Sequence, residues 1–183
     1  MMKTQKIVNS NDEPQPFLKQ LSVVDWLYAF ALMAAAAFAF SKYSQFMDIY
    51  ETTFLFGAAI TFSLLGWFWK SMRYLMPSVA VISLFSISLY QSDLERANQA
   101  FLLKYLIGSQ TAIMWMNVLF VLSALSYWFA LFKRSAFTAK VATTLVWSAV
   151  LMGFVGLMVR WYESYLIAPD VGHIPLSNLY EVF

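Results

Sequence analysis

The chain has 183 residues and a formal net charge of only +2, and 61% of its residues are hydrophobic, 19% aromatic and 12% charged. This composition, with a mean hydropathy of +0.62, excludes an ordinary water-soluble domain and favours a protein of the lipid bilayer, and the dispersed lysines and arginines form no basic stripe of the kind that binds nucleic acid. The lack of cysteine excludes disulfides, thiolate metal sites and a cysteine nucleophile from this chain.

The N-terminal end is polar and is followed by the first apolar run. Residues 1–20 contain Pro14 and Pro16 and show no apolar period, so we interpret them as a tail outside the membrane. Residues 21–40 are long enough, at about 1.5 Å per residue, to cross a hydrocarbon core of about 30 Å. A cleaved signal peptide is the competing interpretation, but the apolar run is too long and the polar segment before it too extended. We therefore predict an uncleaved first span.

Four further apolar runs follow, and each is predicted to cross the membrane. Pro77 falls in the first predicted turn of the second of these runs, where proline is tolerated. The first half of the connection before the fourth span is too polar to cross, whereas residues 101–107 fit a short amphipathic helix in the interface. The predicted fold is an all-α polytopic membrane helical bundle with five transmembrane helices and the start of a sixth. The four runs are residues 52–69, 75–90, 112–132 and 141–159.

The distribution of positive charge predicts the orientation of the spans. Alternating spans place eight lysines and arginines on the side of the N-terminus and four on the other side. By the positive-inside rule the N-terminus is cytoplasmic and the closing stretch lies outside. The first group is Lys3, Lys6, Lys19, Lys70, Arg73, Lys133, Arg134 and Lys140, and the second is Lys42, Arg96, Lys104 and Arg160.

Ionisable side chains within the predicted spans are few, which disfavours a proton-coupled transporter. Asp25 is interpreted as an interfacial residue whose carboxylate is near water, and Asn117 as a residue that bonds a neighbouring helix rather than a substrate. The ten methionines are more readily explained as packing residues than as haem ligands. Aromatic residues near the span ends fit interfacial belts, namely Trp26, Tyr43, Tyr90, Trp128, Trp161 and Tyr162.

The closing stretch is polar and holds the only histidine, His173. If the fifth helix continues, Arg160 and Glu163 are spaced to pair along it. Asn178 and Glu181 then have the spacing of a capping box that opens another helix. A lone histidine in a loop is more often solvated than a metal ligand, and no metal site is predicted. The predicted regions are a cytoplasmic tail at 1–20, a five-helix transmembrane region at 21–160, an extracytoplasmic loop at 161–177 and the start of a sixth helix at 178–183.

The closing segment "RWYES...GHIPLSNLYEVF" resembles the "RWxxSGHFPxSNLYES" segment of the CcsA/ResC family, membrane proteins of system II cytochrome c biogenesis. The chain departs from that pattern by inserting "YLIAPDV" and by carrying Ile174 where phenylalanine is common. The stretches "DWLYAFAL" and "LGWFW" are similar to the proteobacterial branch of the family, often named CcsB. The resemblance covers the last 24 residues most strongly.

The resemblance implies a membrane protein that handles haem b as its substrate and, with a ResB-type partner, helps attach it to apocytochrome c on the outer face of the inner membrane. The complete family protein acts in a haem lyase, or synthase, complex. The tryptophan-rich segment of the family, with its haem-ligating histidines, is missing here, so this chain is expected to be an N-terminal portion, without a catalytic residue of its own.

The residues expected near the haem site are carried over from the family motif and are not axial ligands of the iron. An alternative of a different class is a non-catalytic membrane scaffold or accessory subunit whose outer loop docks a partner. A small-molecule transporter is the third interpretation. The carried-over residues are His173, Arg160, Trp161, Asn178 and Glu181.

Overall fold

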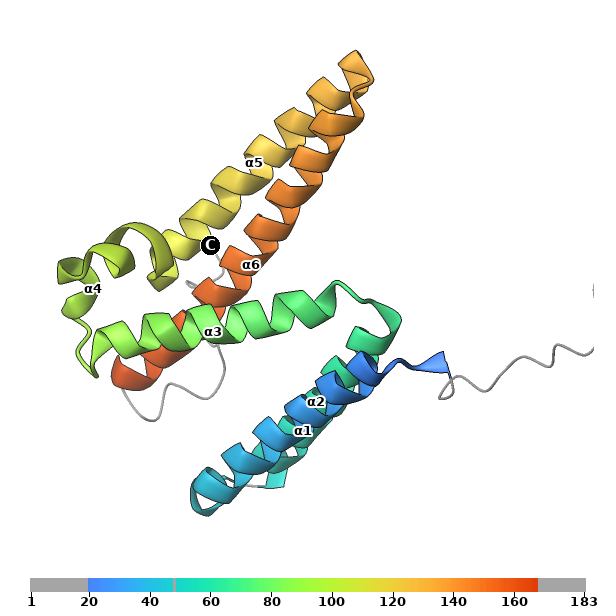
Figure 1. Cartoon of the computed structure of the whole chain (residues 1–183). Helices are drawn as coiled ribbons and strands as arrows, with labels where there is room; N and C mark the ends of the chain where they lie inside the picture. Colours follow the sequence, from blue (N-terminus) through green and yellow to red (C-terminus); the bar gives the residue numbers. More distant parts are fainter. Residues whose placement is uncertain (1–19, 48, 168–183) are drawn as a thin grey trace, which may run out of the picture. The chain divides into compact units, whose positions relative to one another are not determined.

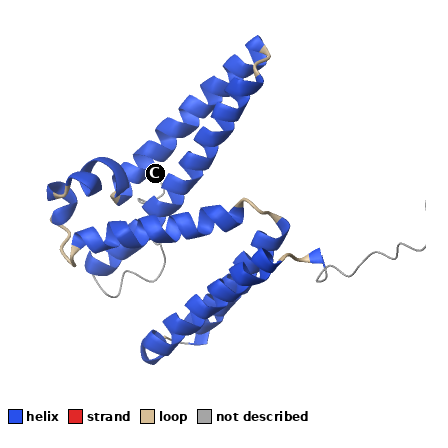
Figure 2. Ribbon diagram, viewed as in Figure 1, coloured by secondary structure: helices blue, strands red, loops and turns tan. Residues whose placement is uncertain are grey.

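A computed structural model describes residues 20–47 and 49–167, and all regular secondary structure in these ranges is helical (Figures 1 and 2). Within these described ranges, five helices are long and apolar enough to cross a membrane, which confirms the all-α polytopic fold and a multi-pass membrane protein. Three short helical segments connect them: the 3₁₀ turn η2 (Ser44–Phe46), α4 (Arg96–Gln99) and the π-helix η3 (Leu103–Ile107). The long helices are α1 (Val23–Tyr43), α2 (Ile49–Phe68), α3 (Met72–Tyr90), α5 (Ser109–Lys133) and α6 (Ala136–Ile167).

All five long helices extend beyond their predicted spans at one end or both, and two of these extensions change an interpretation. The third helix begins at Met72, so Pro77 lies inside it rather than in its first turn. The last helix continues to Ile167, so residues 161–167 are helical, although they were predicted to belong to the outer loop. No proline or glycine interrupts the sequence between Gly156 and this end, and the polar residues after the apolar run are compatible with helix. The predicted start of a sixth helix lies outside the described residues.

The chain divides into two compact units, one ending at Arg73 and one beginning at Tyr74. In the first unit, α1 and α2 lie side by side (Figure 1). Gly66 allows a close approach, because a Cβ at this position would lie 2.3 Å from Cε1 of Tyr28. The rings of Trp26 and Trp67 are 5.5 Å apart at the same end of this pair. Small and aromatic side chains therefore form the contact between the two helices.

The second unit is built around the helix pair α5 and α6, which also lie side by side (Figure 1). A Cβ on Gly153 would lie 2.6 Å from Sδ of Met116, and a Cβ on Gly156 would lie 2.8 Å from Cγ1 of Ile113. Ser123 adds a hydrogen bond of 3.0 Å from its Oγ to the carbonyl oxygen of Ala142. This packing follows the membrane pattern in which small residues let helices approach and hydroxyls bond across the contact.

The carbonyl oxygens of the π-helix η3 accept hydrogen bonds from α3 and α5 and so link these elements of the second unit. A π-helix interrupts the regular hydrogen-bond ladder, so its carbonyls need other donors. Thr111 donates to the carbonyl of Lys104 at 2.9 Å, Trp115 donates to that of Tyr105 at 2.9 Å, and Ser86 of α3 donates to that of Ile107 at 2.8 Å. These bonds fasten η3 to the first turns of α5 and to the last part of α3.

Candidate functional site

A buried carboxylate connects three helices of the second unit. Glu163 of α6 is only 7% exposed. Its Oε1 accepts a hydrogen bond from the hydroxyl of Tyr90, and its Oε2 accepts one of 2.6 Å from Oγ of Ser109. Nη1 of Arg160 lies 3.3 Å from the same Oε2 and forms an ion pair along α6. We call these four residues the Glu163 cluster.

The ends of the helices determine where the cluster forms. Tyr90 is the last residue of α3, Ser109 is the first of α5, and Glu163 lies near the end of α6. The ring of Tyr90 is fully buried and meets that of Tyr162 edge to face at 5.9 Å. A buried carboxylate is costly unless paired and hydrogen-bonded, and here both carboxylate oxygens have donors. The cluster therefore fixes the end of α6 against α3 and α5.

A pocket of about 370 Å³ opens beside the Glu163 cluster. Its lining residues come from the end of α3, the connection between α3 and α5, the start of α5 and the end of α6. Lys104 and Arg160 bring two positive charges to its wall, and Glu163 brings one negative charge. Asn98, Gln110 and Thr111 add uncharged polar groups. A pocket of this size and composition is suited to a small polar or anionic group rather than to an apolar one.

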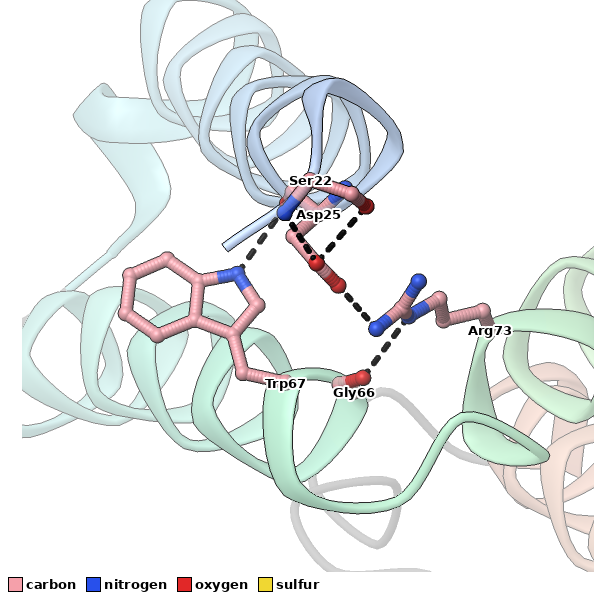
Figure 3. A network of polar contacts seen from close by, with 5 residues as sticks. All are labelled: Ser22, Asp25, Gly66, Trp67 and Arg73. Atoms are coloured by element: carbon pink, nitrogen blue, oxygen red, sulfur yellow. Dashed lines mark hydrogen bonds and ion pairs between the residues drawn. The ribbon is translucent and has the colours of Figure 1, made fainter. Parts of the chain in front are cut away.

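A second polar network lies in the first unit, where α1 begins and α2 ends (Figure 3). Asp25 is 5% exposed and forms an ion pair with Arg73. It also closes a capping box with Ser22, whose backbone N–H donates to Oδ2 of Asp25 at 2.7 Å. Nε1 of Trp67 donates to the carbonyl of Asp25 at 3.0 Å, and Nε of Arg73 donates to that of Gly66 at 2.8 Å. We call these five residues the Asp25 network.

The network corrects one part of the interpretation of Asp25, namely that its carboxylate lies near water. Its carboxylate is instead enclosed by protein and paired with an arginine that comes 48 residues later. The physical reason is that opposite charges at two span ends can neutralise each other when the helices meet, which removes the cost of leaving either in an apolar medium. The hydrogen bonds from Trp67 and Arg73 to backbone carbonyls also hold this junction together, so its role is structural.

The sequence-predicted site residues are only partly among the described residues. Arg160 belongs to the Glu163 cluster, and its neighbour Trp161 is 37% exposed on α6. His173, Asn178 and Glu181 lie outside the described residues. Within the ranges 20–47 and 49–167 no group of three His, Asp or Glu side chains is arranged to hold a metal ion.

Sequence reasoning did not find Tyr90 and Ser109 as partners of Glu163. Tyr90 was assigned to an aromatic belt, and this was wrong, because its side chain is fully buried against α6. The spacing of Arg160 and Glu163 correctly predicted their pairing on a continued helix. A signal for the rest was present, because a carboxylate at the end of an apolar span needs donors from neighbouring helix ends.

Comparison of the chain with protein-family models, with curated proteins and with solved structures gave no significant match.

Proposed function

We propose that this chain is the N-terminal membrane part of a cytochrome c maturation protein. In this proposal the complete protein handles haem and, with a ResB-type partner, helps attach it to apocytochrome c on the outer face of a bacterial inner membrane. The observation that supports it is the burial of Glu163, a residue of the segment that resembles the family motif, at a junction of three helices. The first part of that segment is thereby held in a fixed position.

The role that follows for this chain is mechanical support. Residues 160–164 carry the beginning of the motif, and Glu163 ties them to Tyr90 and Ser109. The rest of the motif continues from a helix whose position is set by these bonds. Haem is the substrate here, and the resemblance assigns its imidazole ligands to residues outside this chain. The axial ligands and the surrounding contacts would orient the iron, and the thioether chemistry belongs to the haem and the apocytochrome.

The pocket beside the cluster is compatible with this role. Haem carries two carboxylates, and charge-assisted bonds from lysine and arginine are the usual way in which proteins hold carboxylates. Lys104 and Arg160 supply such groups at the pocket wall. The distribution of positive charge in the sequence favours a cytoplasmic N-terminus, which would put this pocket at the outer surface.

The experiment is a disruption of the gene in its source cell, complemented with the natural gene or with Arg160→Ala. We expect the disruption to abolish haem that remains covalently bound to c-type cytochromes on denaturing gels, while the absorbance of b-type cytochromes persists. Arg160→Ala should restore less covalent haem than the matched surface variant Arg134→Ala at equal protein level. Unchanged covalent haem in the disrupted strain would refute the proposal.

The alternative function is a non-catalytic scaffold or accessory subunit. It is favoured by the internal satisfaction of the Glu163 cluster, since both carboxylate oxygens are already bonded within the protein. A scaffold role predicts normal covalent haem in the disrupted strain together with the loss of another membrane protein from the membrane fraction. The transporter interpretation is weaker, and it requires substrate uptake that depends on this chain and is independent of haem supply.

A further inference from the structure

The side chain of Asn117, in the middle of a span, has no partner in the described part of the protein. Asn117 lies in α5 and is exposed. The residues of α5 that are buried in the second unit are Ser109, Ala112, Ser123 and Ala130, and Asn117 is not on their face. No hydrogen bond joins its side chain to any of residues 20–47 or 49–167.

The hydroxyl groups of this helix do have partners. Ser126 donates to the carbonyl of Leu122 at 2.7 Å, Ser123 donates to that of Ala142 at 3.0 Å, and the hydroxyls of Tyr127 and Thr143 are 2.8 Å apart. An asparagine amide has two N–H donors and an acceptor, so its needs are larger than those of a hydroxyl. Asn117 therefore differs from the hydroxyl-bearing residues of this helix.

The depth of Asn117 makes this exception costly. It lies about 12 Å from the start of α5, at about 1.5 Å per residue, and both sides of it are apolar. A span of this length crosses a hydrocarbon core of about 30 Å, so the amide lies within the core, where no water can bond to it. Transfer of an amide to an apolar medium without a partner costs free energy, so a polar group of another helix at the same depth is required.

The residues around Asn117 form a continuous exposed seam. They recur at alternating spacings of four and three along α5, which is the period with which one helix packs along another at a small crossing angle. Ala124 provides a small side chain in this seam, where two backbones can approach. The seam residues are Met114, Asn117, Val121, Ala124 and Trp128, and all of them are exposed.

We propose that this seam binds α5 of a second copy of the same chain, with the two Asn117 amides hydrogen-bonded to each other. An amide is complementary to itself, because the N–H of one can donate to the carbonyl of the other. Two copies in the same orientation also place Asn117 at the same depth by identity. A single polar residue in an otherwise apolar seam is a known means of fixing the register of two helices.

The main competing partner is α2 of the same chain. Between Trp26 and Ser41, α1 carries only Tyr28 as a polar side chain, and its ring faces Gly66. In α2, Thr61 is exposed and is the nearest equivalent of a mid-span donor. A threonine hydroxyl can meet only part of the needs of an amide, whereas a second amide can donate and accept at once.

Cysteine cross-linking tests the proposal directly, because the chain has no cysteine of its own. Met114→Cys and Val121→Cys place a thiol on the seam, and Leu122→Cys places one on another exposed face of the same helix. In oxidised membranes we expect the two seam variants to give a disulfide-linked species of twice the 21.0 kDa chain mass, and the control to give little. Equal cross-linking at all three positions, or none at the seam, would overturn the proposal.

A second set of variants tests the amide itself in the Val121→Cys background. Asn117→Leu should weaken association about 3- to 30-fold, the range expected for loss of one interhelical polar contact in a membrane, and Asn117→Gln should retain most of it. Neither variant alters a contact of the α5–α6 pair, and thermal unfolding in detergent should confirm this. Undiminished cross-linking in Asn117→Leu would refute the pairing. So would an intrachain disulfide between Asn117→Cys and Thr61→Cys, which would assign the seam to α2.

Discussion

The hydroxyl of Tyr90, at the end of α3, donates a hydrogen bond to Oε1 of Glu163 in α6, 73 residues further along the chain. Both side chains are buried, and both also line the wall of the neighbouring pocket. With Ser109 as the second donor, this carboxylate connects three helices through a single side chain. This one carboxylate therefore fixes the end of α3 and the start of α5 against α6.

Removal of the Tyr90 hydroxyl should destabilise the second unit. In Tyr90→Phe the ring still fills its site, but Oε1 of Glu163 loses its donor. Hydrogen bonds to charged groups contribute about 1.5–3 kcal/mol, and we expect a loss of that order in the free energy of unfolding. Denaturant unfolding in detergent measures it. Tyr165→Phe removes a hydroxyl from an exposed side chain of α6, the helix of Glu163, and should change the free energy of unfolding little.

A double-mutant cycle of Tyr90→Phe and Glu163→Gln separates this contact from others. If the two residues act through one bond, the double variant should be less destabilised than the sum of the single variants. Strict additivity would mean that the bond contributes nothing measurable.

A methyl group on Gly156 should separate α5 from α6. The added Cβ would lie 3.2 Å from the carbonyl oxygen of Ser109, a backbone atom that cannot rotate away, and 2.8 Å from Cγ1 of Ile113. We expect Gly156→Ala to lower stability by about 1–3 kcal/mol, as overpacking does. Gly57→Ala is the matched control, since a Cβ there meets nothing within 4 Å and alanine favours helix over glycine. A lower thermal midpoint for both variants would contradict this account.

Neutralising one partner of the Asp25–Arg73 ion pair should weaken the first unit. In Arg73→Gln the enclosed carboxylate of Asp25 loses its counter-charge, and the bond from Nε to the carbonyl of Gly66 is lost as well. The expected result is faster proteolysis of the α2–α3 connection. Lys70→Gln removes an exposed positive charge from the same turn and should have no such effect. Combining Asp25→Asn with Arg73→Gln should restore part of the protection, and a further loss would argue against the pair.

Two serines of α5 should differ in importance although they are three residues apart. Ser123 bonds across to α6, whereas Ser126 bonds to a carbonyl of its own helix. Interhelical polar contacts in membranes contribute about 0.6 kcal/mol on average, so Ser123→Ala should lower the stability of the helix pair by about that amount. Ser126→Ala should be close to neutral. The two variants can be compared by unfolding in the same detergent, and equal losses would show that the crossing bond is not special.

The five spans could be predicted because each is an apolar run of sufficient length, which is a local property. The helix ends were harder, because the end of α6 at Ile167 depends on polar residues whose partners come from elsewhere. Glu163 shows this well: its own spacing to Arg160 predicts one partner, but Tyr90 and Ser109 lie in other helices. No local pattern encodes which helix ends will meet.

Asp25 illustrates the same limit for a charged residue near the start of a span. A single acidic residue one turn inside a span is normally explained by proximity to water, and that was the expectation. The sequence also held Arg73 at the start of another helix, but only the packing of α1 on α2 brings the two charges together. Charges near span ends are better considered in pairs between spans than one by one.

The short connection between α5 and α6 has a consequence for biosynthesis. Arg134 adopts a positive φ of 48° at the end of α5, and α6 begins at Ala136. Because the contacts of this hairpin are local in sequence, it can form soon after both segments leave the ribosome. Tyr90 is synthesised well before Glu163. While α3 is already in the membrane, the Tyr90 hydroxyl therefore lacks this acceptor. Among the described helices of the second unit, α6 is therefore synthesised after α3 and α5, and it completes their contacts.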